Sequence, residues 1–134
     1  MFVDACAIIA LLSDEPEAER VSNALAFAEL RMTSPVAVLE AALGLARADK
    51  FGLSIEAVEP LILEFLDERG IEIRDLPPAM ETIRLALAAA HRYRGGRHGL
   101  NLGDCLHYAC AKFHDVPILS TDGEFRQTDF ATVP

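Results

Sequence analysis

Short strand-like segments alternate with longer helical segments along most of the chain, and this alternation constrains the fold more than any other feature. The strand-like segments are rich in apolar and β-branched residues, whereas the helical ones repeat apolar residues every three or four positions. Alternation of this kind is typical of a parallel sheet covered by helices on both faces. The predicted strands are residues 1–4, 31–35, 71–76 and 116–121, with a short fifth near 130–133, and the predicted helices are residues 5–12, 14–30, 36–50, 55–69, 78–94 and 102–115.

Size and composition set the broad class of the protein. The 134 residues are expected to form a single domain (1–134), and a hydrophobic content of 51% suits a packed core. No apolar run approaches the ~20 residues of a membrane helix, and the acid at position 4, with no basic segment before it, does not fit a signal peptide. We therefore predict a cytoplasmic protein whose cysteines (Cys6, Cys105 and Cys110) are free thiols.

The charge balance is acidic, with 21 acidic and 12 basic residues and a net charge of −9. This balance argues against a domain that holds nucleic acid by bulk electrostatics. It does not exclude an enzyme whose acids bind metal ions, because a bound cation offsets part of the negative charge. The basic segment HRYRGGRHG (91–99) holds Arg92, Arg94 and Arg97, and it is either a solvated helix end or a surface that faces an anionic substrate.

Two acids follow predicted strands. Asp4 ends the apolar segment MFVDACAII, and Asp122 comes directly after the strand 116–121. Ligands of open parallel sheets bind beyond the carboxyl ends of the strands, so both acids are expected at the same edge. An Asp-Gly pair is also an ordinary turn signal, and Glu124 is close enough to Asp122 to take its place.

Two more acids lie among mainly apolar residues on predicted helices. The neighbours of Glu40 three and four positions away are all apolar or glycine, which predicts a buried carboxylate that needs an arginine or a metal as partner. Asp104 begins a helix, where an aspartate is common as a cap, but that helix is apolar enough to be a core element. Together the four acids form a cluster of the kind that binds Mg²⁺ or Mn²⁺.

The segments that hold these acids match a known pattern over nearly the whole chain. MFVDACAII, SPVAVLEAALGL, GLNLGDCLHYACAK and PILSTDGEFRQTDF together resemble a PIN domain, and more narrowly the VapC toxins of bacterial toxin–antitoxin pairs. The resemblance implies a PIN-like three-layer α/β/α sandwich with a central, mostly parallel sheet of four or five strands. It also implies an endoribonuclease that depends on Mg²⁺ or Mn²⁺, acts on tRNA or rRNA, forms a homodimer and is neutralised by a cognate antitoxin.

The resemblance assigns roles residue by residue. Asp4 and Asp104 become metal ligands, Glu40 becomes a ligand or positions a water, and Asp122 becomes a more variable fourth acid. Thr121 is expected to contribute a hydroxyl contact. The basic character of segment 91–99, apart from the resemblance, makes its three arginines the candidates for contact with RNA.

Two segments depart from the family pattern. Ala5-Cys6 replaces a Thr-Ser pair, so a thiol stands where a hydroxyl often supports the site. TDGEF (121–125) replaces a Lys-Gly-Asn/Asp-Asp-Phe segment, which leaves the fourth acid open between Asp122 and Glu124.

Other readings stay open at this point. His107, one helical turn after Asp104, is either a half-exposed structural histidine or a group that transfers protons. The apolar surplus of helices 14–30 and 55–69 suggests a dimer face and an antitoxin groove. The alternative functions are an inactive PIN-like module that binds a partner, and another Mg²⁺ enzyme such as a phosphatase.

Overall fold

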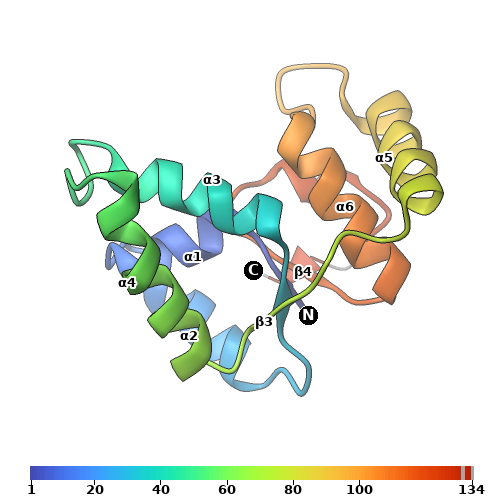
Figure 1. Ribbon diagram of the computed structural model, residues 1–134. Helices are drawn as coiled ribbons and strands as arrows, with labels where there is room; N and C mark the ends of the chain where they lie inside the picture. The colour runs from blue at the N-terminus through green and yellow to red at the C-terminus, as the bar shows by residue number, and fades with distance from the viewer. Residues whose placement is uncertain (131, 134) are drawn as a thin grey trace.

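Five short parallel strands form one sheet in the computed structural model, which describes residues 1–130 and 132–133 (Figure 1). The spatial order is β3-β2-β1-β4-β5, and each neighbouring pair is parallel. The predicted α/β class and the parallel sheet are therefore confirmed. The strands are β1 (Phe2–Val3), β2 (Met32–Thr33), β3 (Glu72–Ile73), β4 (Ile118–Leu119) and β5 (Thr132–Val133).

All six predicted helices are present, and a short 3₁₀ helix that the sequence analysis did not predict precedes β5. The helix expected over 14–30 begins later, because Asp14 adopts a positive φ of 52° and Pro16 follows it in a turn. The helix expected to kink or break at Pro60 continues through that residue. The helices are α1 (Ala5–Leu12), α2 (Ala18–Ala26), α3 (Pro35–Ala46), α4 (Ile55–Glu68), α5 (Ala79–Tyr93), α6 (Leu102–His114) and the 3₁₀ helix η1 (Glu124–Gln127).

The helices cover both faces of the sheet, with α1, α2 and α4 on one side and α5 and α6 on the other (Figure 1). Successive strand residues point to opposite faces, as the pleat requires. Phe2 and Ile118 pack in the cluster under α5 and α6, whereas Val3 and Leu119 pack in the cluster under α1, α2 and α4. Two separate cores therefore sandwich the sheet.

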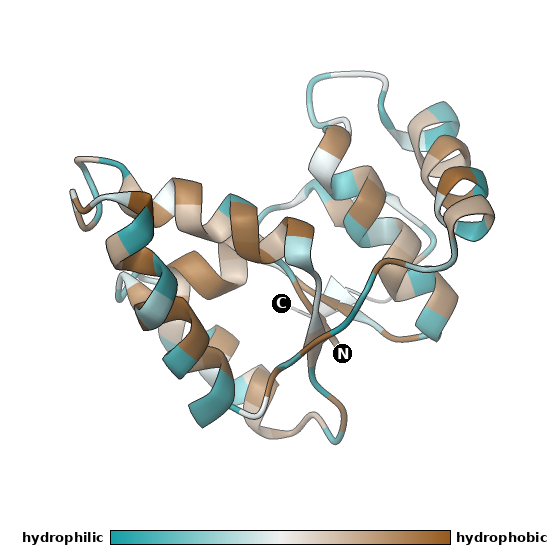
Figure 2. Cartoon of the chain, in the orientation of Figure 1, coloured by the Kyte–Doolittle hydropathy of each residue, from teal (hydrophilic) through white to brown (hydrophobic). Residues whose placement is uncertain are grey.

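Helix α3 contributes to both cores and also carries hydrophobic residues at the surface (Figure 2). Ser34 caps it by accepting a hydrogen bond from the backbone N–H of Ala37 at 3.2 Å, and Pro35 occupies its first turn. Leu39 and Leu43 are 56% and 49% exposed. This helix is therefore well formed but incompletely covered by the rest of the described chain.

The chain changes direction across the sheet between β1 and β4. From β1 it continues outward to β2 and β3, and it then returns to β4 on the other side of β1. A crevice opens at such a switch point beyond the carboxyl ends of the two strands, which here are followed by Asp4 and Ser120. The topology thus places the candidate site where the sequence predicted it.

Cys6, Cys105 and Cys110 are free thiols, as predicted. Among the described residues, no helix combines the length and the apolar character that crossing a membrane requires.

Candidate metal centre

Asp4 is held rigidly at the carboxyl end of β1, where it is 4% exposed and caps α1. Its Oδ1 accepts a hydrogen bond from the backbone N–H of Ala5 at 2.7 Å. Its Oδ2 accepts from the Ser120 hydroxyl at 3.0 Å and from the Cys6 thiol at 2.9 Å. These three donors fix the orientation of the carboxylate without giving it a cationic partner.

Ser120 is a site residue that the sequence analysis missed. Its hydroxyl contacts Asp4 and also accepts from the backbone N–H of Asp122 at 3.2 Å. The available signal was a hydroxyl residue directly after a buried strand, at the same edge as Asp4.

Cys6 supports Asp4 from the position where a hydroxyl is common. Its sulfur lies 3.0 Å from the Ser120 hydroxyl and accepts from the backbone N–H of Thr121 at 3.2 Å. Burial and the neighbouring Asp4 carboxylate raise the pKa of Cys6 to about 12, so the thiol keeps its proton and can donate it. The hydroxyl contact expected from Thr121 is absent among the hydrogen bonds of the described residues, where this residue reaches the site through its backbone N–H alone.

Asp104 both caps a helix and faces the site, so the two readings of this residue hold together. Its Oδ2 accepts from the backbone N–H of Asn101 at 2.8 Å, and its own N–H donates to the Asn101 side chain at 2.9 Å. This capping box leaves the carboxylate 8% exposed. The pKa of Asp104 is raised to about 6, mainly by burial. The charges of Asp4 and Glu124 also raise this pKa, whereas the hydrogen bond from the Asn101 backbone lowers it.

Glu40 reaches the site from α3, but its side chain is 36% exposed, so the prediction of a buried carboxylate was wrong. The apolar face of α3 continues to the surface at this end, as the exposure of Leu43 shows. The carboxylate fits against α6 because position 103 is glycine. A Cβ on Gly103 would lie 1.9 Å from Glu40 Oε1.

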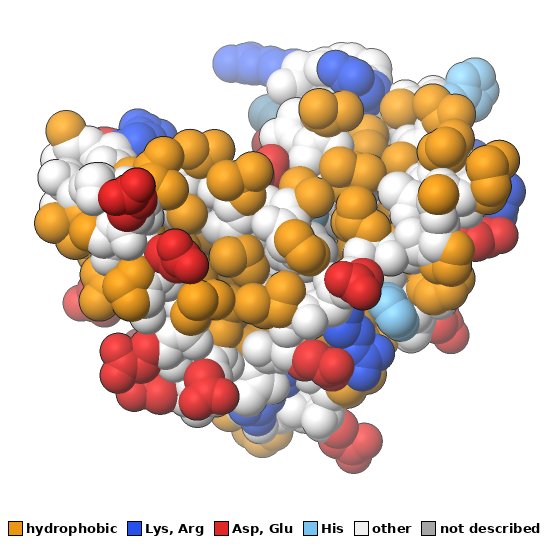
Figure 3. All heavy atoms as spheres, in the orientation of Figure 1, with side chains coloured by type: hydrophobic (Ala, Val, Ile, Leu, Met, Phe, Trp, Pro, Cys, Tyr) orange, Lys and Arg blue, Asp and Glu red, His pale blue; other side chains and the backbone are white. Residues whose placement is uncertain are grey.

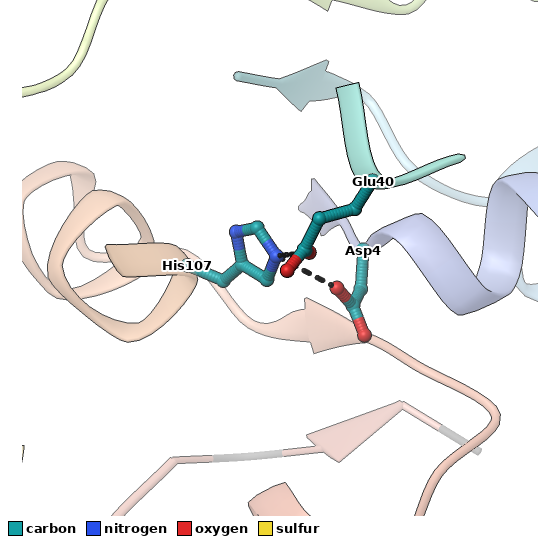
Figure 4. A group of neighbouring side chains, drawn as sticks. All are labelled: Asp4, Glu40 and His107. Carbon is teal, nitrogen blue, oxygen red and sulfur yellow. Dashed lines mark hydrogen bonds and ion pairs between the residues drawn. The ribbon is translucent and has the colours of Figure 1, made fainter. Parts of the chain in front are cut away.

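His107 is fully buried, so the prediction of a half-exposed side chain was also wrong. Its Nε2 lies 2.6 Å from Glu40 Oε2 and 3.4 Å from Asp4 Oδ1, and Figure 4 shows this edge of the ring turned toward both acids. Burial alone would lower the pKa of His107. The hydrogen bond to Glu40 and the charges of Asp4, Glu40 and Asp104 have the opposite and larger effect, so the pKa is raised.

All four predicted acids line one cavity of about 280 Å³. Ligand atoms of Asp4, Glu40 and His107 lie within 4.8 Å of one another. Asp122 is exposed, and its pKa is raised by partial burial and by the charge of Asp4. Burial and the charge of Asp122 raise the pKa of Glu124, which places Glu124 nearby, although it does not line this cavity.

The three predicted arginines are exposed, at the end of α5 and in the loop that follows it. Figure 3 shows basic side chains gathered at the end of the molecule where Figure 1 places this loop. The loop leads into Asn101, which lines the acidic cavity. The residues concerned are Arg92, Arg94 and Arg97.

An α/β/α sandwich with acids gathered at the switch point of its sheet is the architecture of one nuclease class. Residues 1–131 match the PIN domain family, and the chain therefore belongs to it. It is 36% identical over 138 aligned residues to "Ribonuclease VapC30" of Mycobacterium tuberculosis, with 99% of this chain and 98% of that protein covered.

Solved structures show the same fold. The crystal structure of Mycobacterium tuberculosis VapC20, described as a "Sarcin-Ricin loop cleaving toxin", superposes with a TM-score of 0.73 at 18% identity, covering 98% of this chain and 97% of that one. A "Toxin-antitoxin complex from Klebsiella pneumoniae" superposes with a TM-score of 0.66 at 16% identity, covering 96% and 92%. The predicted PIN-like fold is therefore confirmed.

Proposed function

We propose that this protein is a VapC-like endoribonuclease toxin that hydrolyses phosphodiester bonds in RNA with the help of Mg²⁺ or Mn²⁺. The observation that carries the proposal is the convergence of Asp4, Glu40, Asp104 and Asp122 on one cavity at the switch point of a PIN fold. The near full-length similarity to proteins named as VapC ribonucleases supports the same reaction.

The donor set fits a hard divalent cation. Asp4 and Asp104 are buried and lie close enough for the charge of one to raise the pKa of the other, which is the condition that a bound cation relieves. When bound, the cation supplies Lewis-acid chemistry at the phosphodiester. We assign Asp4 and Asp104 as its ligands, with Asp122 as a fourth acid at the rim.

Glu40 is more exposed than Asp4 and Asp104, so it can also act as a proton acceptor. Its carboxylate is the least buried of the three acids near His107, which are Asp4, Glu40 and Asp104, and it faces the cavity from the α3 side. A half-exposed carboxylate at that point can hold the cation and can also accept a proton from an attacking water. The buried Asp4, with three hydrogen-bond donors on it, is the more rigid ligand.

RNA would reach the cavity along the segment from Arg92 to Asn101. Arg92, Arg94 and Arg97 are the substrate contacts that we propose, because a chain of net charge −9 needs a local basic surface to approach an anionic polymer. The substrate class that we propose is structured RNA of the tRNA or rRNA kind.

A cognate antitoxin and a second copy of the chain are the protein partners that we propose. The grooved surface between α3 and α4 encloses about 380 Å³ and is lined mostly by apolar side chains. Figure 3 shows hydrophobic side chains over this region and over α5 and α6. Exposed apolar grooves are common at protein interfaces, and the Klebsiella pneumoniae neighbour is itself a toxin–antitoxin complex.

RNA cleavage by the purified chain, free of any antitoxin, tests the proposal. Total RNA is incubated with Mg²⁺ or Mn²⁺, with EDTA, and with an Asp104→Asn variant. We expect cutting that needs the metal and is lost in the variant. Intact RNA in every reaction, from protein shown to be folded by circular dichroism, would favour an inactive PIN-like binding module instead.

A further inference from the structure

His107 places an imidazole directly beside the carboxylates of Asp4 and Glu40. The ring lies against Phe2, with centroids 5.6 Å apart and planes inclined by 31°. Nε2 faces Glu40 and Asp4, as Figure 4 shows, while Nδ1 points away from them. Nδ1 is buried and has no hydrogen-bond partner within the residues that the structure describes.

The two ring nitrogens decide between two roles for this residue. A histidine that ligates a cation through Nε2 needs a lone pair there and therefore carries its hydrogen on Nδ1. Metal-bound histidines almost always donate that second N–H to an acceptor. Here the donation has no acceptor in the described chain, and burying an unpaired N–H costs about 1–3 kcal/mol. The surroundings therefore favour a hydrogen on Nε2.

With its hydrogen on Nε2, His107 donates to Glu40 across a distance of 2.6 Å. This is a charge-assisted hydrogen bond between a fully buried ring and a partly exposed carboxylate. Glu40 needs such an anchor, because its side chain is 36% exposed and is long enough to take up many orientations in water. Gly103 leaves the space that the anchored carboxylate occupies.

We propose that His107 is a positioning residue whose Nε2–H holds the Glu40 carboxylate toward the cavity, so that Glu40 is already oriented when the cation binds. This inference rests on the proposed function, since it needs a cation at the acids. In this proposal His107 orients Glu40 and does not bind the cation itself, which is held by carboxylate oxygen atoms. Donors of this kind typically change metal affinity or activity about 10–100-fold when removed.

Mg²⁺ and Mn²⁺ titrations by calorimetry, on His107→Gln and His107→Leu, test the proposal first. The Gln side chain can place an N–H near the position of Nε2, whereas Leu fills similar space without a donor. We expect the Leu variant to bind about 10–100-fold more weakly and the Gln variant to stay within about threefold of the unchanged protein. His114→Gln makes the same change two turns further along α6 and serves as the control.

Nitrogen NMR of the unchanged protein tests the same point without any risk of misfolding. Long-range ¹H–¹⁵N spectra report which ring nitrogen of His107 carries the hydrogen, in EDTA and after saturation with Mg²⁺. We expect it on Nε2 in the Mg²⁺-loaded protein. A ring with a hydrogen on Nδ1 and none on Nε2 there, or equal metal affinity of all variants, would overturn the positioning role. Failure of the unchanged protein to bind either cation would overturn the proposed function as well.

Discussion

Gly103→Ala should inactivate the protein without destabilising it. Gly103 is the second residue of α6, and a Cβ built there lies 1.9 Å from Oε1 and 2.6 Å from Cδ of Glu40. Ordinary contact begins near 3.4 Å, so the Glu40 carboxylate must move by about 1.5 Å. That movement carries it away from His107 and from the orientation in which it faces the cavity.

The substitution should have a large effect on the cleavage rate and a small effect on stability. Misplacing a reacting group by about 1 Å can lower a rate about 10²-fold, so we predict a loss of that order in the metal-dependent cleavage rate. Stability should hold, because the clash falls on the mobile end of a side chain and alanine is the better helix former by up to about 1 kcal/mol.

Single-turnover cleavage of a labelled RNA measures the rate, and urea unfolding measures stability. Gly95→Ala is the matched control for the unfolding measurement, since a Cβ at that position meets no atom within 4 Å. Full activity of a folded Gly103→Ala protein would refute the reasoning, because it would mean that the observed position of Glu40 is not needed for cutting.

Four further predictions concern the charges and donors of the site and of the basic segment. Asp104→Asn should raise the melting temperature of the EDTA-treated protein by several degrees while abolishing cleavage, because it removes a buried charge that lacks a cation. Folding raises the pKa of Asp104 from 3.8 to about 6, so the folded state favours the protonated carboxyl. The free energy of unfolding in EDTA should therefore increase as the pH falls from about 6 to 4. Urea unfolding of the Asp104→Asn variant should lack this increase. Cys6→Ser should retain activity and Cys6→Ala should lose part of it, as measured by cleavage rate, because only serine keeps a donor for Asp4. Arg94→Ala and Arg97→Ala should weaken RNA binding and flatten its salt dependence without changing Mg²⁺ affinity, as filter binding at several salt concentrations would show.

The sequence predicted the fold because the alternation of strands and helices leaves few topologies open. The apolar segments around β1 and β4 are buried, and their alternate residues enter two different cores, as a covered parallel sheet requires. Element ends were less accurate. The paired part of each strand is shorter than its apolar segment. The strand predicted near 130–133 is Thr132–Val133, and Ala131 lies outside the described residues.

The site could be predicted only where one element determines it. Asp4 and Asp104 follow from strand ends and helix starts, which are local features of the sequence. The exposure of Glu40 depends on which other elements pack against α3, and the sequence of α3 alone does not determine that packing. Likewise, the spacing from Asp104 put His107 on the right face, but the approach of Glu40 from another helix is tertiary.

Anomalous scattering from a crystal soaked in Mn²⁺ tests the central claim most directly, since the claim is that these acids hold the cation on which cutting depends. The account predicts a peak within ligand distance of carboxylate oxygens of Asp4 and Asp104, in protein that cleaves RNA and is inhibited by EDTA. A peak elsewhere, or no peak at these acids in protein that still cuts RNA, would contradict it.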